Sequence, residues 1–415
     1  MMYTTRYRSH HDASRALKSR FEAHTDKTAY VEGLLSAPSA SRRAVYLHVP
    51  FCTKICSFCP FHRPDALSRR LYDAYLIEEI DRIADKPYMR APIDAINFGG
   101  GTPTALTPEQ MARVLDRLHT AFDIRQGAEI SVETSITELS DEMTRALLEG
   151  GVNRLSIGVQ TFDNAGRRLL GRRGSGEAAA ERIAKTKELG FENVGIDLIY
   201  NYPGQTEKSL DKDIETIRAL GLAGISFYAL ILHDGTPILS RITEEQVASM
   251  RDIGREKAFF DRIVSELRAD GYAFFELTKL IRNGLDRYEY VRIRHTGGSC
   301  IAIGHGAGGN LDRYVYRNSA KAPLLSQAAP ISSMGRVLEE AYFLFDELIN
   351  DLQKTEVDLD RYANRLQIDR TRKLTPLLER ASGEGLITVS GSRITLTDDG
   401  IFWGNNFIDE LVRSV

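Results

Sequence analysis

Short apolar runs alternate with longer segments of helical periodicity through the middle of the chain. Buried strands are predicted at 44–49, 94–98, 128–133, 154–159, 193–199 and 224–230. Helices are predicted at 71–84, after Thr107, at 141–149, 176–189, 210–220 and, as one long helix, at 244–270. Near-continuous apolar strands that alternate with helices indicate a parallel sheet covered by helices, hence the α/β class.

Glycine and polar signals follow these strands rather than precede them. Gly99–Pro103 comes directly after the second strand, and Thr107–Gln110 then has the order of a capped helix start, with Pro108 at the first helical position. An α/β barrel carries its chemistry at this end of its strands. A doubly wound sheet is the competing fold.

The two flanks of this region differ in pattern. Residues 1–40 read as a polar arm with a weak helical stripe over 12–24, and residues 41–270 form the barrel. Residues 271–335 are a glycine-rich connecting segment of lower regularity. Residues 336–415 predict an α+β, winged-helix-like unit, with its helices and hairpin strands at 336–348, 359–366, 370–382, 386–389 and 393–396.

Composition narrows the class of protein. The chain has 415 residues and a formal net charge of −3, so it has no global attraction to nucleic acid or to an anionic membrane. From Ala341 onward there are 13 acidic and 9 basic residues, so we expect the C-terminal unit to pack or to cover substrate rather than to bind DNA. There is no apolar run of membrane-spanning length, and residues 1–40 lack the apolar core of a signal peptide. We expect a cytoplasmic location.

Three of the four cysteines fall within eight residues. Cys52, Cys56 and Cys59 have the spacing C-x3-C-x2-C, and thiolates suit zinc or iron–sulfur clusters. A zinc finger needs a second ligand pair, and a ferredoxin needs a fourth cysteine; neither follows. Three thiolates would hold three irons of a [4Fe-4S] cluster and leave the fourth iron open. Three buried cysteines or a zinc knuckle are the alternatives.

This triad and its flanks, Tyr46-x-His48-x-Pro50-Phe51 and Phe58-Cys59-Pro60, resemble the radical S-adenosylmethionine (SAM) enzymes. The resemblance implies a partial (β/α)6 barrel of the TIM type. It also implies that the open iron chelates SAM and that an electron from the cluster cleaves SAM to a 5′-deoxyadenosyl radical. The exposed triad indicates a reducing compartment.

Three further positions carry chemistry at the strand ends. The Gly99–Pro103 segment lets the backbone approach a ligand, although a simple tight turn would have the same sequence. Glu133 could hold the α-ammonium of SAM, or it is a solvated charge. Asp197 lies inside an apolar strand, where a carboxylate is costly unless it has a partner.

Segments 155–162, 170–172, 197–200 and 203–206 resemble the oxygen-independent coproporphyrinogen III oxidase (HemN-like) group, whose members can bind two SAM molecules. The resemblance implies that Tyr46, Gly100, Gly101 and Glu133 serve the first SAM with the cluster. It assigns to the second SAM a set made of Phe58, Thr102, Gln160, Arg172, Asp197 and Ile231.

Within this group three readings compete. Coproporphyrinogen oxidation would require a further cysteine shortly after Cys59, where Pro60 and Phe61 stand. A haem chaperone (HemW-like) would carry His-Asn-x-x-Tyr-Trp, which segment 287–294 lacks. Segments 286–288, 304–309 and 314–318, and the arm spacing of Leu17, Phe21 and His24, resemble the ChuW/HutW/HmuW haem-utilisation C-methyltransferases, of anaerobilin synthase type.

That last branch implies anaerobic opening of haem to a linear tetrapyrrole, by methyl transfer from SAM, with release of iron. A flavodoxin-like or other low-potential donor would supply electrons. Two propionates need cations, and the candidates are Arg292, Arg294 and Arg313, each of which is also an ordinary surface charge. His305 could bind haem iron, or it is a plain histidine in a glycine loop.

Overall fold

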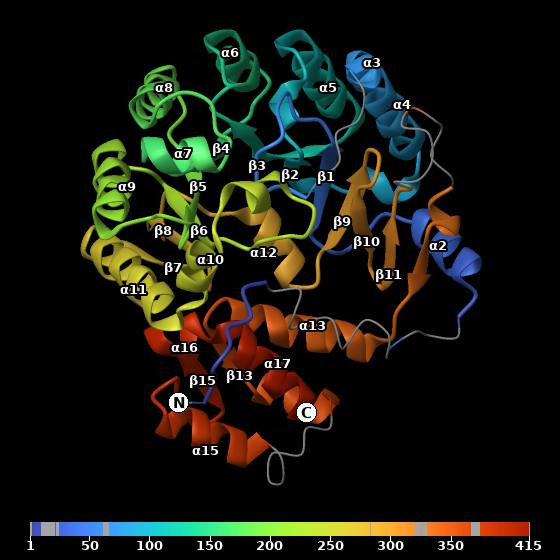
Figure 1. Ribbon diagram of the computed structural model, residues 1–415. Helices are drawn as coiled ribbons and strands as arrows, with labels where there is room; N and C mark the ends of the chain where they lie inside the picture. Colours follow the sequence, from blue (N-terminus) through green and yellow to red (C-terminus); the bar gives the residue numbers. More distant parts are fainter. Residues whose placement is uncertain are drawn as a thin grey trace.

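One sheet of twelve strands forms the centre of the molecule (Figure 1). The computed structural model describes residues 2–9, 21, 25–60, 66–282, 284–319, 325, 330–366 and 374–414. Across the sheet the strands run in the order β12-β11-β10-β9-β1-β2-β3-β4-β5-β6-β8-β7.

The six predicted strands lie side by side in chain order, each parallel to the next. They are β1 (Arg43–Val49), β2 (Ile93–Gly100), β3 (Ile124–Ser135), β4 (Arg154–Gln160), β5 (Val194–Tyr200) and β6 (Gly224–Ala229). This order is that of a partial (β/α)6 barrel, so the predicted fold class is confirmed. The doubly wound alternative, which requires a reversal of strand order, is not observed.

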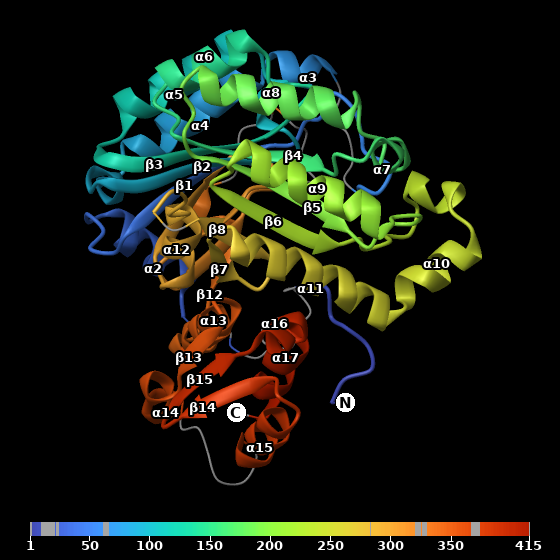
Figure 2. The same ribbon diagram turned by 90° about the vertical axis from the view of Figure 1, so that its left-hand side faces the viewer.

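Helices cover the outer, convex face of this sheet (Figures 1 and 2). They are α3 (Ala66–Arg70), α4 (Tyr72–Ala84), α5 (Pro108–Ala121), α6 (Asp141–Glu149), α8 (Gly176–Glu188), α9 (Glu207–Leu220) and α11 (Ile253–Ala269), while α7 (Asn164–Leu169) and α10 (Glu244–Arg251) lie at the ends of the strands (Figure 2). The predicted capping box at Thr107 and Gln110 is present. The prediction of one helix over 244–270 was wrong, because Asp252 leaves the helical conformation and caps the amides of Gly254 and Arg255.

The segment predicted as a less regular connector instead extends the sheet on both sides. Its strands are β7 (Tyr272–Glu276), β8 (Lys279–Arg282), β9 (Ser299–Ile303), β10 (Gly308–Leu311), β11 (Tyr314–Arg317) and β12 (Gly335–Val337). β8 pairs antiparallel with β6, and β9 pairs parallel with β1. The helix α12 (Glu289–His295) packs Tyr290 and Ile293 against Ala44, Ala95 and Cys300. It therefore covers the bottom of the concave side of the barrel.

The C-terminal unit lies below the barrel in Figure 1 and contains a small antiparallel sheet of order β13-β15-β14. Its elements are α13 (Glu340–Gln353), β13 (Glu356–Asp358), α14 (Asp360–Leu366), α15 (Thr375–Gly383), β14 (Ile387–Ser390), β15 (Arg393–Leu396), α16 (Asp398–Phe402) and α17 (Gly404–Ser414). Short 3-10 helices elsewhere are Pro87–Arg90, Pro103–Ala105, Pro237–Arg241 and Ile331–Ser333. The helices expected at 359–366 and 370–382 and the hairpin are present, although residues 370–373 lie outside the described residues. The helix expected at 336–348 instead begins at Glu340 and ends at Gln353, because Gly335–Val337 pairs with β11 as strand β12. The division of the chain at 40, 270 and 335 stays a prediction.

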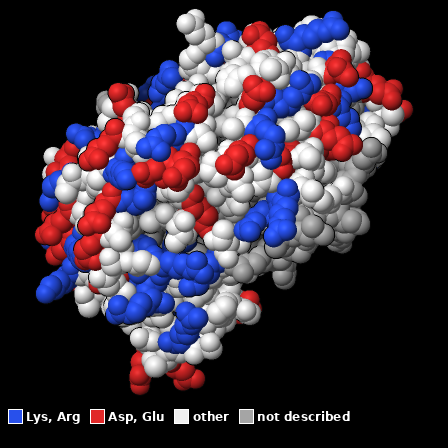
Figure 3. All heavy atoms as spheres, turned by 90° about the horizontal axis from the view of Figure 1, so that it is seen from above, with Lys and Arg blue, Asp and Glu red and all other residues white. Residues whose placement is uncertain are grey.

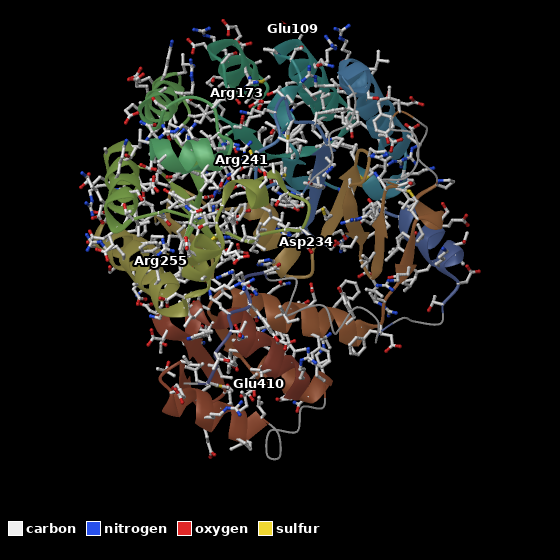
Figure 4. The ribbon with its side chains drawn as sticks, viewed as in Figure 1. Glu109, Arg173, Asp234, Arg241, Arg255 and Glu410 are labelled. Carbon is white, nitrogen blue, oxygen red and sulfur yellow. The ribbon has the colours of Figure 1, made fainter. Side chains whose placement is uncertain are left out.

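Residues 2–9 run between the barrel and the C-terminal unit (Figure 2). Arg6 donates from Nη1 to Glu256 Oε1 (2.6 Å) on α11 and from Nε to the Phe402 carbonyl (2.6 Å) on α16. Tyr3 donates to Glu410 Oε2 (3.0 Å), a residue labelled in Figure 4. The arm also forms α2 (Lys27–Leu35), whereas the helix predicted over 12–24 falls almost entirely outside the described residues.

Acidic and basic side chains are interspersed over the face seen in Figure 3, as the small net charge leads one to expect. Within the described residues, no helix is both long enough and apolar enough to cross a membrane.

Candidate functional site

The concave side of the sheet is polar, in contrast to the helix-covered side. Register places Tyr46, Asn97, Ser131 and Arg154 in one row across β1 to β4. Ser131 Oγ donates to Asn97 Oδ1 (2.5 Å), which confirms that these side chains share a face. An unusual concentration of polar groups inside a barrel marks this side as the place for a bound ligand.

The cysteine loop leaves the carboxyl end of β1 and is held on one side by the glycine segment that follows β2. The Gly101 amide donates to the Val49 carbonyl (2.8 Å), and the Thr102 amide donates to the Phe51 carbonyl (2.7 Å). Cys52 Sγ lies 3.4 Å from Thr102 Oγ1. The two predicted motifs, 50 residues apart, therefore form one structure.

The loops after β4 and β6 hold the other side of the cysteine loop. Ser57 donates from its amide to the Leu170 carbonyl (3.1 Å), and the Ile238 amide donates to the Ser57 carbonyl (2.8 Å). Phe58 packs on an apolar cluster that includes Leu170 and Ile238. Asp234 and Arg241, labelled in Figure 4, come from the loop after β6, which crosses the centre of that view.

The cysteines fit a cluster better than a single ion. Among the described side chains, no group of three or more His, Cys, Asp or Glu residues is placed so that it could hold one metal ion. Each iron of a [4Fe-4S] cluster takes its own thiolate, so three partly exposed thiolates spread along a loop suit the cluster. None of the four cysteines forms a disulfide, and Cys300 is fully buried on β9, in contrast to the triad. Arg172 donates from Nη1 to Cys56 Sγ (2.9 Å).

Glu133, Tyr46 and the glycine segment form a first group beside this loop. A Cβ on Gly99 would lie 2.8 Å from Glu133 Oε1 and 3.0 Å from Tyr46 Cε2, so only glycine allows this approach. Gly100 has a φ of +112°, and a Cβ there would lie 2.7 Å from the His48 ring. Solvent reaches the Glu133 side chain, although the atoms of the concave wall surround it on the other sides. This enclosure, which removes part of the hydration of the carboxylate, and the nearby charge of Asp197 raise the pKa of Glu133 to about 7.

A second group lies at the ends of β4 and β5. Gln160 has a φ of +73° where the pairing of these strands shifts register, and its Nε2 would lie 3.1 Å from a Cβ on Gly158. Arg172 donates to the Gly158 carbonyl, and Gly158 pairs in register with Asp197. Burial raises the pKa of Asp197, and the Ser156 hydroxyl donates to it over a long 3.5 Å. A non-glycine residue held at positive φ is strained, and such strain clusters at ligand sites.

The structure separates the candidates for substrate binding. Arg294 Nη1 lies 3.3 Å from the Tyr290 hydroxyl, and the Tyr290 ring stacks on Tyr46, with centroids 5.9 Å apart. Arg292 and Arg313 instead donate to main-chain carbonyls, at 2.6 Å and 2.9 Å. Of the three predicted cations, Arg294 is the one brought toward Tyr46.

The remaining predicted residues lie close to this centre. His305 contacts the first group through Tyr72, whose hydroxyl accepts from the His305 amide (3.0 Å) and donates to the His48 carbonyl (2.9 Å). Burial, with Arg317 and His305 nearby, lowers the pKa of His48 to about 4, so it is neutral at pH 7. Ile231 is half-buried directly after β6.

The sequence interpretation missed a charged floor below these groups. Asp286 binds Arg154 and lies 3.4 Å from Lys279 Nζ, and all three side chains are buried. Lys279 precedes Leu280 and Ile281 in a short strand. It carries the same signal that singled out Asp197, a charge within an apolar run. Arg317 and Arg336, described below, carry no comparable signal.

Comparison with known proteins agrees with this geometry. Residues 46–217 match the radical SAM superfamily. Anaerobilin synthase of Escherichia coli O157:H7 is 29% identical over 388 residues, covering 90% of this chain and 84% of that relative. The haem chaperone HemW of Lactococcus lactis is 28% identical over 372 residues, covering 89% and 97%. The solved structure of coproporphyrinogen III oxidase (HemN) from Escherichia coli has a TM-score of 0.80 at 20% identity, covering 100% of this chain and 98% of its own.

Proposed function

We propose that this protein, a radical SAM protein with a HemN-like fold, opens the haem macrocycle anaerobically by methyl transfer from SAM, giving a linear tetrapyrrole and releasing iron. Its cofactors are a [4Fe-4S] cluster and SAM. When bound, they supply one electron and a carbon-centred radical. The protein's own residues bind, orient and shield these groups.

The observation that carries the proposal is the pair of separate carboxylate groups on the concave side. Glu133 on β3, beside Gly99 and Tyr46, suits the ammonium of one SAM molecule. Asp197 on β5 lies in register with Gly158, which contacts Gln160 and Arg172, and this second group suits another SAM molecule. One SAM would then give the radical and the other the methyl carbon.

The residues around the cysteine loop have defined roles in this proposal. Cys52, Cys56 and Cys59 hold the cluster, and Arg172 orients Cys56 through its hydrogen bond of 2.9 Å to Sγ. Thr102 and Phe58 line the loop on its two sides, so they limit the access of water. Neutral His48 shares a hydrogen bond of 2.9 Å at Nδ1 with the Tyr46 hydroxyl, which holds the Tyr46 ring in place.

Three observations favour ring opening over the other readings. Anaerobilin synthase matches 90% of the chain, and Pro60 directly follows Cys59 where coproporphyrinogen oxidation would require a further cysteine nearby. The motif expected of a chaperone is absent from 287–294. The chaperone HemW is nevertheless 28% identical, so the test must distinguish haem degradation from haem binding without a reaction.

The test is anaerobic incubation of the cluster-loaded protein with haem, reductant and SAM labelled with ¹³C in its methyl group. Ring opening predicts a linear tetrapyrrole carrying the label and free iron, detected by mass spectrometry and chelator absorbance. Haem that binds but stays intact would favour the chaperone. Conversion of coproporphyrinogen III alone would favour the oxidase. Replacing the chemical reductant with a flavodoxin-like protein tests the proposed low-potential donor.

A further inference from the structure

The strands β10 to β12 extend the concave side of the barrel beyond β9. Cys300 on β9 packs against Tyr290 on the concave side, and register places Asn310, Val315 and Arg336 on the same face as Cys300. The opposite face of these strands is buried through Tyr314, Tyr316 and Val337. Because side chains alternate along a strand, Arg317 faces the concave side with Val315.

Three arginines from three elements therefore face one space. Arg317 comes from β11, Arg336 from β12 and Arg294 from α12, and each is solvent-exposed. The charges of Arg294 and Arg317 lie close enough to Tyr46 to oppose the rise of its pKa on burial. The charges of Arg294 and Arg336 do the same for the pKa of Tyr342 on α13. We call Arg294, Arg317 and Arg336 the arginine wall.

Acids also face this space and must be counted. The charge of Asp346 raises the pKa of Arg294 and of Tyr342. The charge of Glu133 raises the pKa of Tyr46. Among the described residues named by these electrostatic contacts, three guanidinium groups face the carboxylate of Asp346, so these side chains together are net positive. Aromatic rings adjoin it, because Tyr290 stacks on Tyr46 beside Arg294.

The opposite part of the concave side has a different balance. It carries the carboxyls Glu133, Asp197 and Glu276, while the cations Arg154 and Lys279 are bound to Asp286 and Arg172 lies beside Asp197. Burial raises the pKa of all three carboxyls, so this part has no excess of cations, and an anionic group would be attracted to the wall instead. The concave side therefore favours a ligand whose negative charges lie along one edge.

We propose that the arginine wall binds the two carboxylates on one edge of a flat macrocycle, with Tyr46 and Tyr290 against its ring. This rests on the proposed porphyrin substrate and specifies its class, a dicarboxylic porphyrin of the haem type. Guanidinium groups pair with carboxylates through two parallel hydrogen bonds, and aromatic rings stack on flat ligands. Coproporphyrin III, with carboxylates on all four rings, would place two of them near Glu133 and Asp197.

The test compares haem with its dimethyl ester, in which both carboxylates are neutral. Absorbance titrations under anaerobic conditions would use the cluster-loaded protein and the variants Arg294→Gln, Arg317→Gln and Arg336→Gln. Each variant should bind haem about tenfold or more weakly, because a charge-assisted hydrogen bond is lost, and should bind the ester as the parent does. Arg287→Gln is the control, since Arg287 is exposed and its side chain donates to the Gly127 carbonyl (3.4 Å), on a different strand end from the wall. It should match the parent with both ligands.

The outcomes separate this inference from the proposed reaction. Arginine-dependent haem binding without a ring-opened product would keep the wall and remove the reaction. Variants that bind haem as the parent does would overturn the wall, whatever the product. Equal weakening for haem and ester in variants with parental melting temperature and iron content would also overturn it. Equal affinity of the parent for haem and coproporphyrin III would overturn the restriction to one edge.

Discussion

Arg154 and Asp286 form a two-pronged ion pair in the floor of the barrel, with Nε–Oδ1 at 2.9 Å and Nη2–Oδ2 at 3.1 Å. Their side chains are 2% and 0% exposed. Burial acts against the Asp286 carboxylate, but Arg154 and Lys279 outweigh it and lower its pKa to about 2. The Tyr288 ring lies 4.2 Å from the Arg154 guanidinium and 4.4 Å from Lys279 Nζ, which closes the network.

Asp286→Ala should destabilise the protein by about 3–5 kcal/mol, because it leaves Arg154 charged and buried without its carboxylate. Urea unfolding followed by circular dichroism measures this change. The triple variant Arg154→Met, Lys279→Met, Asp286→Leu is the control and should recover much of the loss, since it removes all three buried charges. A single variant no less stable than the parent would show that the pair does not hold the floor.

Replacement of Cys52, Cys56 or Cys59 by alanine should each remove most bound iron and sulfide after reconstitution, because each thiolate holds one iron. Cys300→Ala should keep parental iron content, because Cys300 is buried on β9 beside Tyr290, away from the triad. Iron and sulfide analysis with the visible absorbance of the cluster checks both. Cluster loss in Cys300→Ala at parental melting temperature would mean that the ligand set is different.

SAM affinity should fall as pH drops below about 7. Glu133 has its pKa raised from 4.5 to about 7, chiefly by burial, so SAM-free protein is progressively protonated there below that pH. An ammonium partner favours the carboxylate, so binding must release that proton, and affinity should fall by up to about tenfold per pH unit. Calorimetry in buffers of different ionisation enthalpy measures the release.

Glu133→Gln provides the control, since it should bind SAM weakly and without this pH dependence. The same raised pKa makes the contribution of Glu133 to the stability of SAM-free protein decrease as pH rises from 4.5 to about 7. Absence of proton release near pH 6.5 in the parent would remove Glu133 from ammonium binding.

Asp197→Asn should keep the fold while abolishing methyl labelling of the product. Its hydrogen bond from Ser156 is long at 3.5 Å, and burial already disfavours its charge, so a neutral amide should change stability by less than about 1 kcal/mol. Melting temperature, 5′-deoxyadenosine formation and ¹³C labelling are measured together. Normal labelling would separate Asp197 from the second SAM, and joint loss of stability and both activities would assign it a structural role.

Local patterns predicted the strand and helix series well. The capping box at Thr107 and the strand–helix alternation depend on neighbours in sequence, and these elements match the structure closely. The pairing of β9 with β1, such as Arg43 with Ser299, joins residues far apart and leaves no local signal. For this reason the glycine-rich segment could not be recognised as part of the sheet.

The candidate site shows the same limit. Motif spacing identified the cysteine loop, and the rule that charges rarely sit in apolar strands identified Asp197. That rule applied equally to Lys279 and would have found the floor. Arg317 and Arg336 lie in short, ordinary strands, and only the register between β11 and β12 brings them to one face.

The arm has a consequence for the order of events during synthesis. Arg6 finds one of its partners 396 residues later, at Phe402, and the Tyr7 amide binds Asn406 Oδ1 at 2.9 Å. In the folded protein the Glu256 side chain is fully buried, and both Arg6 and Arg8 form ion pairs with it. During synthesis the barrel leaves the ribosome before α16 and α17. Residues 2–9, although they are made first, can therefore form their hydrogen bonds to Phe402 and Asn406 only after the C-terminus has been made. Until then the hydrogen bonds of the arm that join the barrel to the C-terminal unit are missing, so the two parts are held together by their remaining contacts alone.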